Sequence, residues 1–291
     1  MKIGIVGKGK HGTRWAKVIK DHIKIGRDLN FEGVDAVVIA VPHKYLASIT
    51  RKALEAGKHV LCEKPGAMKA EEIKKNMKLA KRKKLKYMVG YNYRFHDGFI
   101  KARKLFKRGV IGKLLFIRAR HGFGGRKGYD KEWRLNKKIS GGGHLHDQGV
   151  HMIDMAMSYM GKINKVQGMT ADTYWKAGTE DNGFVLLKSK NVIASIHSSV
   201  TQWKRLHSFE IYGTKGYVII QGLGGRYGEE EHLILGKRTN DPDVTRERWI
   251  DCDADANKSL KRELKEFIST KPSALNAYET LKIVEEVYEQ N

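Results

Sequence analysis

The chain has 291 residues, and because domains have roughly 150 residues, its length predicts about two domains. Hydrophobic residues make up 41% and charged residues 30% of the chain, which allows a packed core and excludes an intrinsically disordered protein. The net charge of +24 excludes neither a solvated basic surface nor an anionic partner such as a phosphorylated cofactor, a nucleotide-sugar or nucleic acid.

No targeting or membrane signal is visible. Residues 1–7 run directly into an apolar strand and a glycine loop, without the basic start and long apolar stretch of a signal peptide. The longest apolar run, residues 36–42, is too short to span a bilayer. Cys62 and Cys252 form neither a disulfide framework nor a metal-binding spacing. These features predict a cytoplasmic protein that does not enter the membrane.

The first 90 residues alternate between short apolar segments and amphipathic segments. Apolar runs rich in β-branched residues predict strands at residues 2–6, 35–41, 59–62 and 86–89. Apolar residues spaced three and four apart predict helices at residues 11–21, 45–56 and 70–83. This alternation is typical of a parallel sheet with helices on both faces, so residues 1–92 are predicted to form an α/β Rossmann domain that binds a dinucleotide.

A glycine loop stands between the first predicted strand and the first predicted helix. Its residues, Gly7-Lys8-Gly9-Lys10-His11-Gly12, match the pattern G-x-G-x-x-G in the strand-to-helix context that the pattern requires. The first glycine permits a tight turn, the second lets pyrophosphate approach the backbone, and the third lets the helix pack closely. The helix N-terminus then favours phosphate. A glycine turn without a ligand is the alternative, but the context favours binding of NAD or NADP.

The segment that should hold the adenine ribose is unusually short. A dinucleotide fold usually carries an acidic residue about 20 residues beyond the loop, at the end of the second strand. Residues 20–34 have room for one brief strand, Ile23-Lys24-Ile25, but not for a further helix. Asp28 and Glu32 are the acidic candidates, whereas Arg27 could face a 2′-phosphate. NAD and NADP therefore stay equal alternatives.

The pattern changes after residue 92, where strands follow one another. Strands are predicted at residues 113–121, 163–172, 183–188, 192–200, 207–213 and 216–221. Helices are predicted at residues 99–108, 143–160, 258–269 and 274–289, with a loop at residues 122–142. Residues 93–291 are therefore predicted to form an α+β domain with an open, mainly antiparallel sheet. We expect this domain to bind substrate and to pair with other copies in a homodimer or homotetramer.

Five segments in order along nearly the whole chain carry a family resemblance. They are the glycine loop; Val38-Ile39-Ala40-Val41-Pro42 with the later Glu63-Lys64-Pro65; Gly90-Tyr91-Asn92-Tyr93-Arg94-Phe95; Trp133-Arg134 with Gly141-Gly142-Gly143 and Asp147-Gln148-Gly149-Val150-His151; and Phe209-Glu210-Ile211-Tyr212-Gly213. Together they resemble the glucose–fructose oxidoreductase and inositol dehydrogenase family, the Gfo/Idh/MocA group. One position departs from that family: Leu46 stands where a histidine is usual, and His43 comes too early to replace it and is given no role.

The resemblance implies an NAD(P)-dependent oxidoreductase that moves a hydride between the nicotinamide and a sugar hydroxyl or carbonyl. Lys64 would polarise the reacting oxygen, His151 would exchange its proton, and Asp147 would orient the substrate or tune the pair. Glu63 and Pro65 would set the turn that brings Lys64 to the nicotinamide. Beyond the glycine loop, the residues expected to contact the cofactor are Val41, Pro42, Glu63 and Lys64.

The residues themselves support this catalytic cluster. Asp147 and His151 are four apart on a predicted helix and therefore share one face. Histidine titrates near neutral pH, as a proton-transfer group should. Lys64 follows a buried strand at its carboxyl end, the side where open α/β sheets bind ligands. Each residue taken alone could be an ordinary surface residue, so the prediction of a catalytic site depends on the joint pattern.

Histidines near the cluster raise the alternative of a metal site. His121, His144, His146 and His151 lie within one stretch of the chain. They contain no H-x-x-x-H pair, however, and neither cysteine is near them. No metal is therefore predicted.

The substrate is expected to be a sugar or a nucleotide-sugar. Aromatic rings stack on sugars and arginine holds carboxylate or phosphate, although core packing is the alternative for the aromatic residues. The residues predicted to border the substrate are Asn92, Tyr93, Arg94, Trp133 and Arg134. Residues 221–228 resemble members of the family that act on surface-polysaccharide sugars, which supports the substrate class by analogy.

Two other functions stay open at this stage. The short adenosine region could leave a non-catalytic nucleotide- or sugar-binding sensor. The positive charge could attract nucleic acid, but no helix–turn–helix, zinc or RNA-binding motif occurs, so no specific nucleic-acid partner is predicted.

Overall fold

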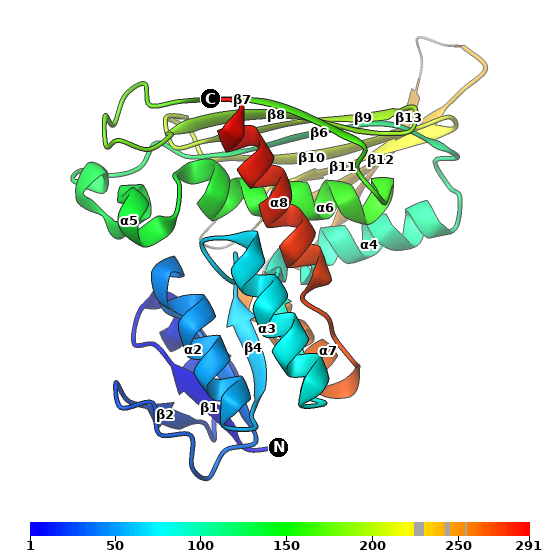
Figure 1. The fold of residues 1–291 in the computed structure, drawn as a ribbon. Coiled ribbons are helices and arrows are strands. Elements are labelled where there is room, and N and C mark those ends of the chain that lie inside the picture. Colours follow the sequence, from blue (N-terminus) through cyan, green and yellow to red (C-terminus); the bar gives the residue numbers. More distant parts are fainter. Residues whose placement is uncertain (224–229, 242–244, 254) are drawn as a thin grey trace.

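Two sheets form the framework of the protein (Figure 1). The computed structural model describes residues 1–223, 230–241, 245–253 and 255–291. A five-stranded sheet belongs to the N-terminal part of the chain, and an eight-stranded sheet to the C-terminal part. The predicted fold class, a Rossmann-like parallel sheet followed by a mainly antiparallel sheet, is therefore confirmed.

The N-terminal sheet has the order β2-β1-β3-β4-β5, and all neighbouring strands are parallel. Its strands are β1 (Ile3–Val6), β2 (Ile23–Ile25), β3 (Ala36–Ile39), β4 (His59–Glu63) and β5 (Tyr87–Gly90). Its helices are α1 (Lys10–Val18), α2 (His43–Glu55) and α3 (Ala70–Arg82). Every residue of β3 is completely buried, as expected for a central strand between two layers of helices.

The connection between α1 and β3 is as short as the sequence predicts. β2 has three residues and pairs with β1 along a parallel register in which Gly4 faces Ile23. Residues 26–35 form turns and no helix before the chain enters β3. The edge of the sheet where a dinucleotide's adenosine would lie is therefore built from one brief strand and a turn.

One face of the N-terminal sheet is covered by a helix from the far end of the chain. The apolar side of α7 (Ala256–Ser269) places Leu260 and Phe267 in one buried cluster with Ile5 and Trp15. The sequence predicts this helix but not its position, because an amphipathic pattern does not say which surface covers its apolar side. The N-terminal sheet is thus completed by residues that lie outside the stretch 1–92.

The C-terminal sheet has the order β13-β12-β11-β10-β6-β9-β8-β7, with β6 and β9 parallel and all other neighbours antiparallel. Its strands are β6 (Leu114–Gly122), β7 (Lys165–Ala171), β8 (Asn182–Ser189), β9 (Val192–Ser199), β10 (Leu206–Gly213), β11 (Gly216–Gln221), β12 (His232–Arg238) and β13 (Thr245–Asp251). The last two were not predicted. β13 is a charged edge strand without an apolar alternation, the kind of edge that discourages further strand pairing.

Helices cover one face of this large sheet and leave the other open (Figure 1). The covering helices are α4 (Asp97–Lys107), α6 (Val150–Met160) and α8 (Leu275–Glu289), which lie between the sheet and the N-terminal part. The predicted loop at residues 122–142 contains a short helix, α5 (Lys137–Ser140), and two 3₁₀ turns. Among the described residues, none of the helices has both the length and the apolar character needed to cross a bilayer.

Candidate active site

The glycine loop forms a backbone cradle at the carboxyl end of β1. Gly7 has a φ of +119°, and a Cβ there would lie 2.1 Å from the carbonyl oxygen of Ala40. A Cβ on Gly12 would lie 2.0 Å from the carbonyl oxygen of Gly7, so both positions exclude a side chain. Gly9 differs, because a Cβ there would meet no atom within 4 Å. The loop therefore packs tightly from behind and is open at Gly9, where α1 begins without a side-chain cap.

A cavity of about 240 Å³ lies in front of this cradle. It is lined by residues 7–11 and 40–43, and by Glu63, Lys64, Trp133, Arg134, Asp147 and Gln148. Apart from Gly12, every residue predicted to contact the cofactor therefore borders one space. Parallel strands explain this convergence, because the carboxyl ends of β1, β3 and β4 meet at the same edge of the sheet.

Lys64 and Asp147 form a buried ion pair in this cavity. The Lys64 Nζ lies 2.7 Å from Oδ1 of Asp147 and also donates to the backbone carbonyl of Asp147. The exposed fractions are 8% for Lys64 and 4% for Asp147. Burial by itself would raise the pKa of Asp147, but Lys64, His43 and Arg134 together hold that pKa well below its ordinary value. Asp147 is therefore a carboxylate at neutral pH, and it holds the Lys64 amine in the cavity.

His43 is a site residue that the sequence analysis missed. Its Nδ1 lies 2.8 Å from the carbonyl oxygen of Ser140, and its Nε2 lies 3.4 Å from Oδ1 of Asp147. Burial lowers the pKa of His43, although Asp147 opposes this shift. A neutral ring carries one N–H, so it can donate either to the Ser140 carbonyl or to the Asp147 carboxylate, but not to both. The available signal was its place directly after Pro42, at the carboxyl end of β3, the same sheet edge that carries Lys64.

His151 lies behind the cavity instead of in its wall. Its ring is 2% exposed and stacks on Tyr93 with 4.0 Å between ring centroids. No hydrogen bond joins it to Lys64 or Asp147, and the described residues offer no partner for its Nδ1. Burial lowers the pKa of His151 well below its ordinary value, and the charge of Lys64 lowers it further while Asp147 raises it. The ring is neutral and lies within the electrostatic influence of the Lys64–Asp147 pair.

The predicted helix over residues 143–160 has a different start. Residues Leu145–Gly149 form a π-helical turn, and α6 begins at Val150. Asp147 lies in the wider π turn and His151 in the first turn of α6, so the expected i, i+4 arrangement on one regular helix face is corrected. The π turn directs Asp147 to the cavity while His151 is packed against Tyr93.

Two of the five residues predicted to border the substrate line the cavity. Trp133 and Arg134 do so, and the Arg134 guanidinium lies over the Trp133 ring at 4.6 Å. Tyr93 is buried in the core, and Arg94 forms a two-hydrogen-bond ion pair with Asp154. Core packing, the alternative given for the aromatic residues, thus describes Tyr93, whereas Arg94 is held by its ion pair.

Asn92 is likewise absent from the lining of both cavities near Lys64, although its Nδ2 has no hydrogen-bond partner among the described residues. Asn92, Tyr93 and Arg94 thus lie outside the described lining of the cleft, and their contact with a substrate stays a prediction. They form a short 3₁₀ turn after β5, and this turn directs them into the protein. Residues 224–228 of the segment that resembles polysaccharide enzymes lie outside the described residues.

A second cavity of about 310 Å³ continues from the first. Both are bordered by Lys10, His11, Arg134, Asp147 and Gln148, so they form one cleft with Asp147 at the junction. The second branch is bounded by β6 and by the chain that follows it. The described residues contain no group of three or more His, Cys, Asp or Glu side chains placed to hold a metal ion. The cleft thus offers a glycine-loop branch, a charged pair at its centre and a second branch.

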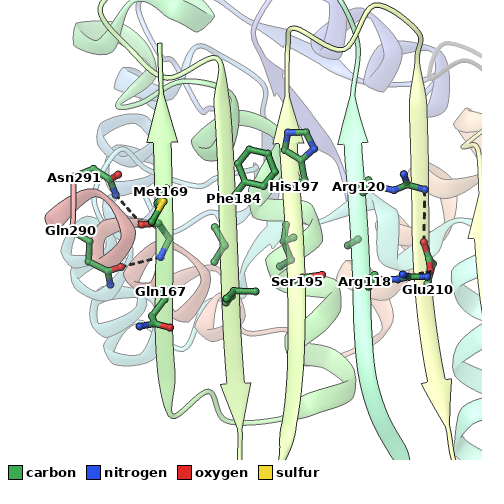
Figure 2. Close-up of a pocket in the computed structure, with 15 residues that line it drawn as sticks. Arg118, Arg120, Gln167, Met169, Phe184, Ser195, His197, Glu210, Gln290 and Asn291 are labelled. Atoms are coloured by element: carbon green, nitrogen blue, oxygen red, sulfur yellow. Dashed lines mark hydrogen bonds and ion pairs between the residues drawn. The ribbon is translucent and has the colours of Figure 1, made fainter. Parts of the chain in front are cut away.

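A larger hollow lies elsewhere, on the open face of the C-terminal sheet (Figure 2). It has a volume of about 990 Å³ and is bordered by side chains of β6 to β10 and by Gln290 and Asn291. Its Met169 and Phe184 are more than half exposed. Its shallow, partly apolar floor contains no catalytic pair, so the smaller cleft at Lys64 is the candidate active site.

Two family models match the chain. Residues 99–219 match the GFO/IDH/MocA C-terminal domain, and residues 27–91 match a model described as an oxidoreductase family with an NAD-binding Rossmann fold. The matched ranges cover most of both sheets but begin after the glycine loop. They agree with the expected nicotinamide dinucleotide cofactor and with the resemblance stated from the sequence.

Relatives with named activities act on sugars, according to their names. The chain is 36% identical over 138 residues to levoglucosan dehydrogenase of Pseudarthrobacter phenanthrenivorans, which covers 47% of the chain and 35% of that protein. It is 30% identical over 233 residues to 2,7-anhydro-N-acetylneuraminate hydratase of Mediterraneibacter gnavus, covering 74% of the chain and 60% of that protein. The matched part thus spans between about a third and three fifths of these relatives.

Solved structures share the whole fold. A levoglucosan dehydrogenase in complex with NADH superimposes with a TM-score of 0.86 at 21% identity, covering 100% of this chain and 98% of that one. An aldose-aldose oxidoreductase from Caulobacter crescentus superimposes with a TM-score of 0.77 at 22% identity, covering 99% and 88%. The two-sheet architecture is therefore shared with these solved structures.

Proposed function

The chain belongs to the Gfo/Idh/MocA oxidoreductase family, and we propose that it is an NAD(P)-dependent enzyme that moves a hydride between the nicotinamide and a carbon of a sugar or nucleotide-sugar. The observation that carries the proposal is the cleft in which the Lys64–Asp147 pair faces the glycine loop. The named relatives favour a sugar hydroxyl or carbonyl as the reacting group.

The glycine loop fits a dinucleotide phosphate. Backbone closes the rear of the loop at Gly7 and Gly12, whereas the front is open at Gly9 and leads into the cavity. The first N–H groups of α1 and the side chain of Lys10 favour an anion at this opening. When bound, the nicotinamide supplies the hydride acceptor or donor. Either NAD or NADP is compatible with this proposal, because the short β2–β3 connection provides no ribose ligand that decides between them.

Lys64 is proposed to donate a hydrogen bond to the reacting oxygen of the sugar. Its buried ammonium would stabilise negative charge that develops on this oxygen when the hydroxyl loses its proton. Asp147 holds the ammonium at 2.7 Å, and Nε2 of His43 lies 3.4 Å from the same carboxylate oxygen. His43 is therefore proposed as a positioning residue that keeps Asp147, and through it Lys64, in place.

His151 is proposed to exchange the proton of the reacting hydroxyl. Support for this role comes from its family motif, its neutral ring and its electrostatic coupling to Lys64 and Asp147. Its Nδ1 has no partner in the described part of the chain, so this nitrogen could accept a proton or a hydrogen bond. Reaching the substrate requires a movement of the ring or of Tyr93, because His151 does not line the cleft.

Titration with NADH and with NADPH tests the cofactor proposal. We expect saturable enhancement of nicotinamide fluorescence with at least one of them, followed by turnover on a panel of sugars. Gly9→Val should weaken cofactor binding by about tenfold or more, because a Cβ at this position meets no atom within 4 Å and the side chain would occupy the opening. Thermal unfolding of the variant should match the wild type.

The opposite result would identify a different kind of protein. If the folded wild type bound neither NADH nor NADPH, the oxidoreductase proposal would fail and a non-catalytic nucleotide- or sugar-binding sensor would be favoured. Binding that Gly9→Val leaves unchanged would contradict the assignment of the glycine loop.

A homodimer or homotetramer through the open sheet face is also proposed. Figure 2 shows Phe184 and His197 side by side on this face, and their rings stack with 4.0 Å between centroids. The side chains of Met169, Leu186 and Ile193 add exposed apolar surface, with exposed fractions of 76%, 49% and 48%. Exposure of this apolar area to water is unfavourable, and packing against the same sheet of a second copy would bury the area.

Light scattering tests this assembly. We expect a dimer or tetramer for the wild type and a monomer for Phe184→Glu with Leu186→Glu, since charges would be buried at the interface. The control Tyr45→Glu changes an exposed aromatic residue of α2 and should leave the mass unchanged. A monomeric wild type at micromolar concentration would exclude the assembly.

The cytoplasm is proposed as the working compartment. Both cysteines are free thiols: Cys62 is buried and Cys252 is partly exposed. Free thiols persist in reducing surroundings. No specific nucleic-acid partner is proposed, because the basic residues near the cleft are explained by phosphate and substrate binding.

A further inference from the structure

Three arginines in the second branch of the cleft each lie over an aromatic ring. The pairs are Arg126 over Tyr129 at 5.6 Å, Arg134 over Trp133 at 4.6 Å, and Arg205 over Phe123 at 5.5 Å between the guanidinium carbon and the ring centroid. All three arginines border the same cavity of about 310 Å³. An aromatic ring beneath a guanidinium restrains its plane, so the N–H edges are oriented before a ligand arrives.

The charge around this branch is strongly positive. Five of its described lining residues are cationic, namely Lys10, Arg14, Arg126, Arg134 and Arg205, whereas Glu132 and Asp147 are its acidic ones. Glu132 forms ion pairs with both Arg126 and Arg134, so it holds two of the arginines side by side.

The buried histidine of the branch responds to this positive charge. Burial, followed by the charges of Lys64 and Arg205, lowers the pKa of His121 to about 4. His121 is therefore neutral at pH 7 and can offer a hydrogen bond without adding charge. Because cationic side chains outnumber acidic ones among the described lining residues, this branch attracts an anionic group more strongly than a neutral sugar.

We propose that the second branch of the cleft is an oxyanion subsite, in which Arg126, Arg134 and Arg205 bind a carboxylate or phosphate carried by the reacting sugar. The inference rests on the proposed function and adds the substrate's charge to it. Arg134 lies 3.4 Å from Asp147 through its Nε, so the anionic group is bound close to the catalytic pair. The group therefore belongs to the sugar that reacts, as in a uronate or a sugar phosphate.

Two of the three arginines lie outside the cavity at the glycine loop. Arg126 and Arg205 border the second branch and not the cavity at the glycine loop. Arg126 follows β6 and Arg205 directly precedes β10, whereas the loop lies at the end of β1 in the other part of the molecule. Neutralising these two arginines should consequently leave cofactor binding intact.

Calorimetry on the NADH-loaded protein, or on the NADPH-loaded protein if that cofactor binds, tests the subsite. The probes are glucose, glucuronate, glucose 6-phosphate and inorganic phosphate. We expect glucuronate or glucose 6-phosphate to bind at least about tenfold more tightly than glucose, and inorganic phosphate to bind measurably. The stronger of the two anionic sugars distinguishes a carboxylate from a phosphate subsite.

The double variant Arg126→Gln with Arg205→Gln locates the binding. The double variant should weaken binding of the anionic probes by about 10- to 100-fold. Its affinity for the nicotinamide cofactor should stay within about twofold of the wild type. The control, Arg51→Gln with Arg108→Gln, removes the same charge from exposed positions of α2 and the end of α4. It should change binding of the anionic probes by less than about twofold.

Each contrary outcome has its own meaning. The proposed subsite would be overturned if the wild type bound glucose and the anionic sugars equally well, or bound no anion at all. It would also be overturned if the double variant and its control lost equal affinity for the anionic probes. Failure of the wild type to bind either nicotinamide cofactor would overturn the proposed function instead, so the two ideas fail separately.

Discussion

Replacing Lys64 or His151 with alanine is expected to lower turnover by about 10²- to 10⁴-fold, while nicotinamide cofactor binding survives. Lys64→Ala removes the ammonium proposed to stabilise charge on the reacting oxygen, and it leaves the Asp147 carboxylate buried without its main partner. His151→Ala removes the group proposed to exchange the proton. Steady-state rates and fluorescence titrations of each variant measure the two effects separately.

Matched variants show whether these losses come from chemistry. Lys75→Ala removes an exposed lysine from α3 and should leave turnover unchanged. Lys64→Arg should stay impaired, because a planar guanidinium does not reproduce the point charge of the amine beside Asp147. Wild-type rates in both Lys64→Ala and His151→Ala would remove these residues from the mechanism.

A comparison with His43 separates the two histidines. His43→Asn should act through the position of Asp147, so we expect a smaller loss of turnover than in His151→Ala, with the pH profile of the rate preserved. If His43→Asn instead abolished the pH dependence and His151→Ala did not, proton exchange would belong to His43, whose Nε2 borders the cleft.

The protein is expected to lose several kcal/mol of stability between pH 7 and pH 5. Six buried histidines, His43 among them, have lowered pKa values. Burial is the main cause for each, and it brings the pKa to about 4 for His121 and to about 3 for His144 and His146. His151 and His207 are lowered well below their ordinary value by the same cause.

The sign of this effect follows from proton uptake. Below the ordinary histidine pKa of 6.5, the unfolded chain binds protons that the folded chain refuses. The free energy of unfolding therefore falls as the pH drops below about 6.5, by up to about 1.4 kcal/mol per pH unit for each group. Burial raises the pKa of Glu263 and of Glu180, so these two carboxyl groups oppose the trend in part.

Urea unfolding at pH 7, 6 and 5 measures this dependence. A total stability of about 5–15 kcal/mol is usual, so the expected loss is a large fraction of it. His207→Phe keeps a ring against Phe99 while removing one titrating group, and it should flatten the pH dependence. Equal unfolding midpoints at pH 7 and pH 5 in the wild type would contradict the expectation.

Local patterns in the sequence sufficed for most elements and for the glycine loop. Strand and helix periodicity predicted all five strands of the N-terminal sheet, and the glycine spacing identified a loop whose backbone contacts exclude side chains at Gly7 and Gly12. The order of parallel strands then made it predictable that Lys64 would lie at the same edge as this loop. The alternation of apolar and polar residues did not predict β13, because an exposed edge strand does not need an apolar face.

The sequence by itself therefore determined the fold class and the glycine cradle, because these depend on residues close in sequence or on the regular crossing of parallel strands. Lys64 and Asp147 are far apart in the chain, and the family motifs around them indicated their cluster. Only the tertiary structure decided that His43 contacts Asp147, that His151 packs behind Tyr93, and that α7 returns to the first sheet. Such contacts join residues far apart in the chain, and their geometry is set by how whole layers pack, which no local pattern encodes.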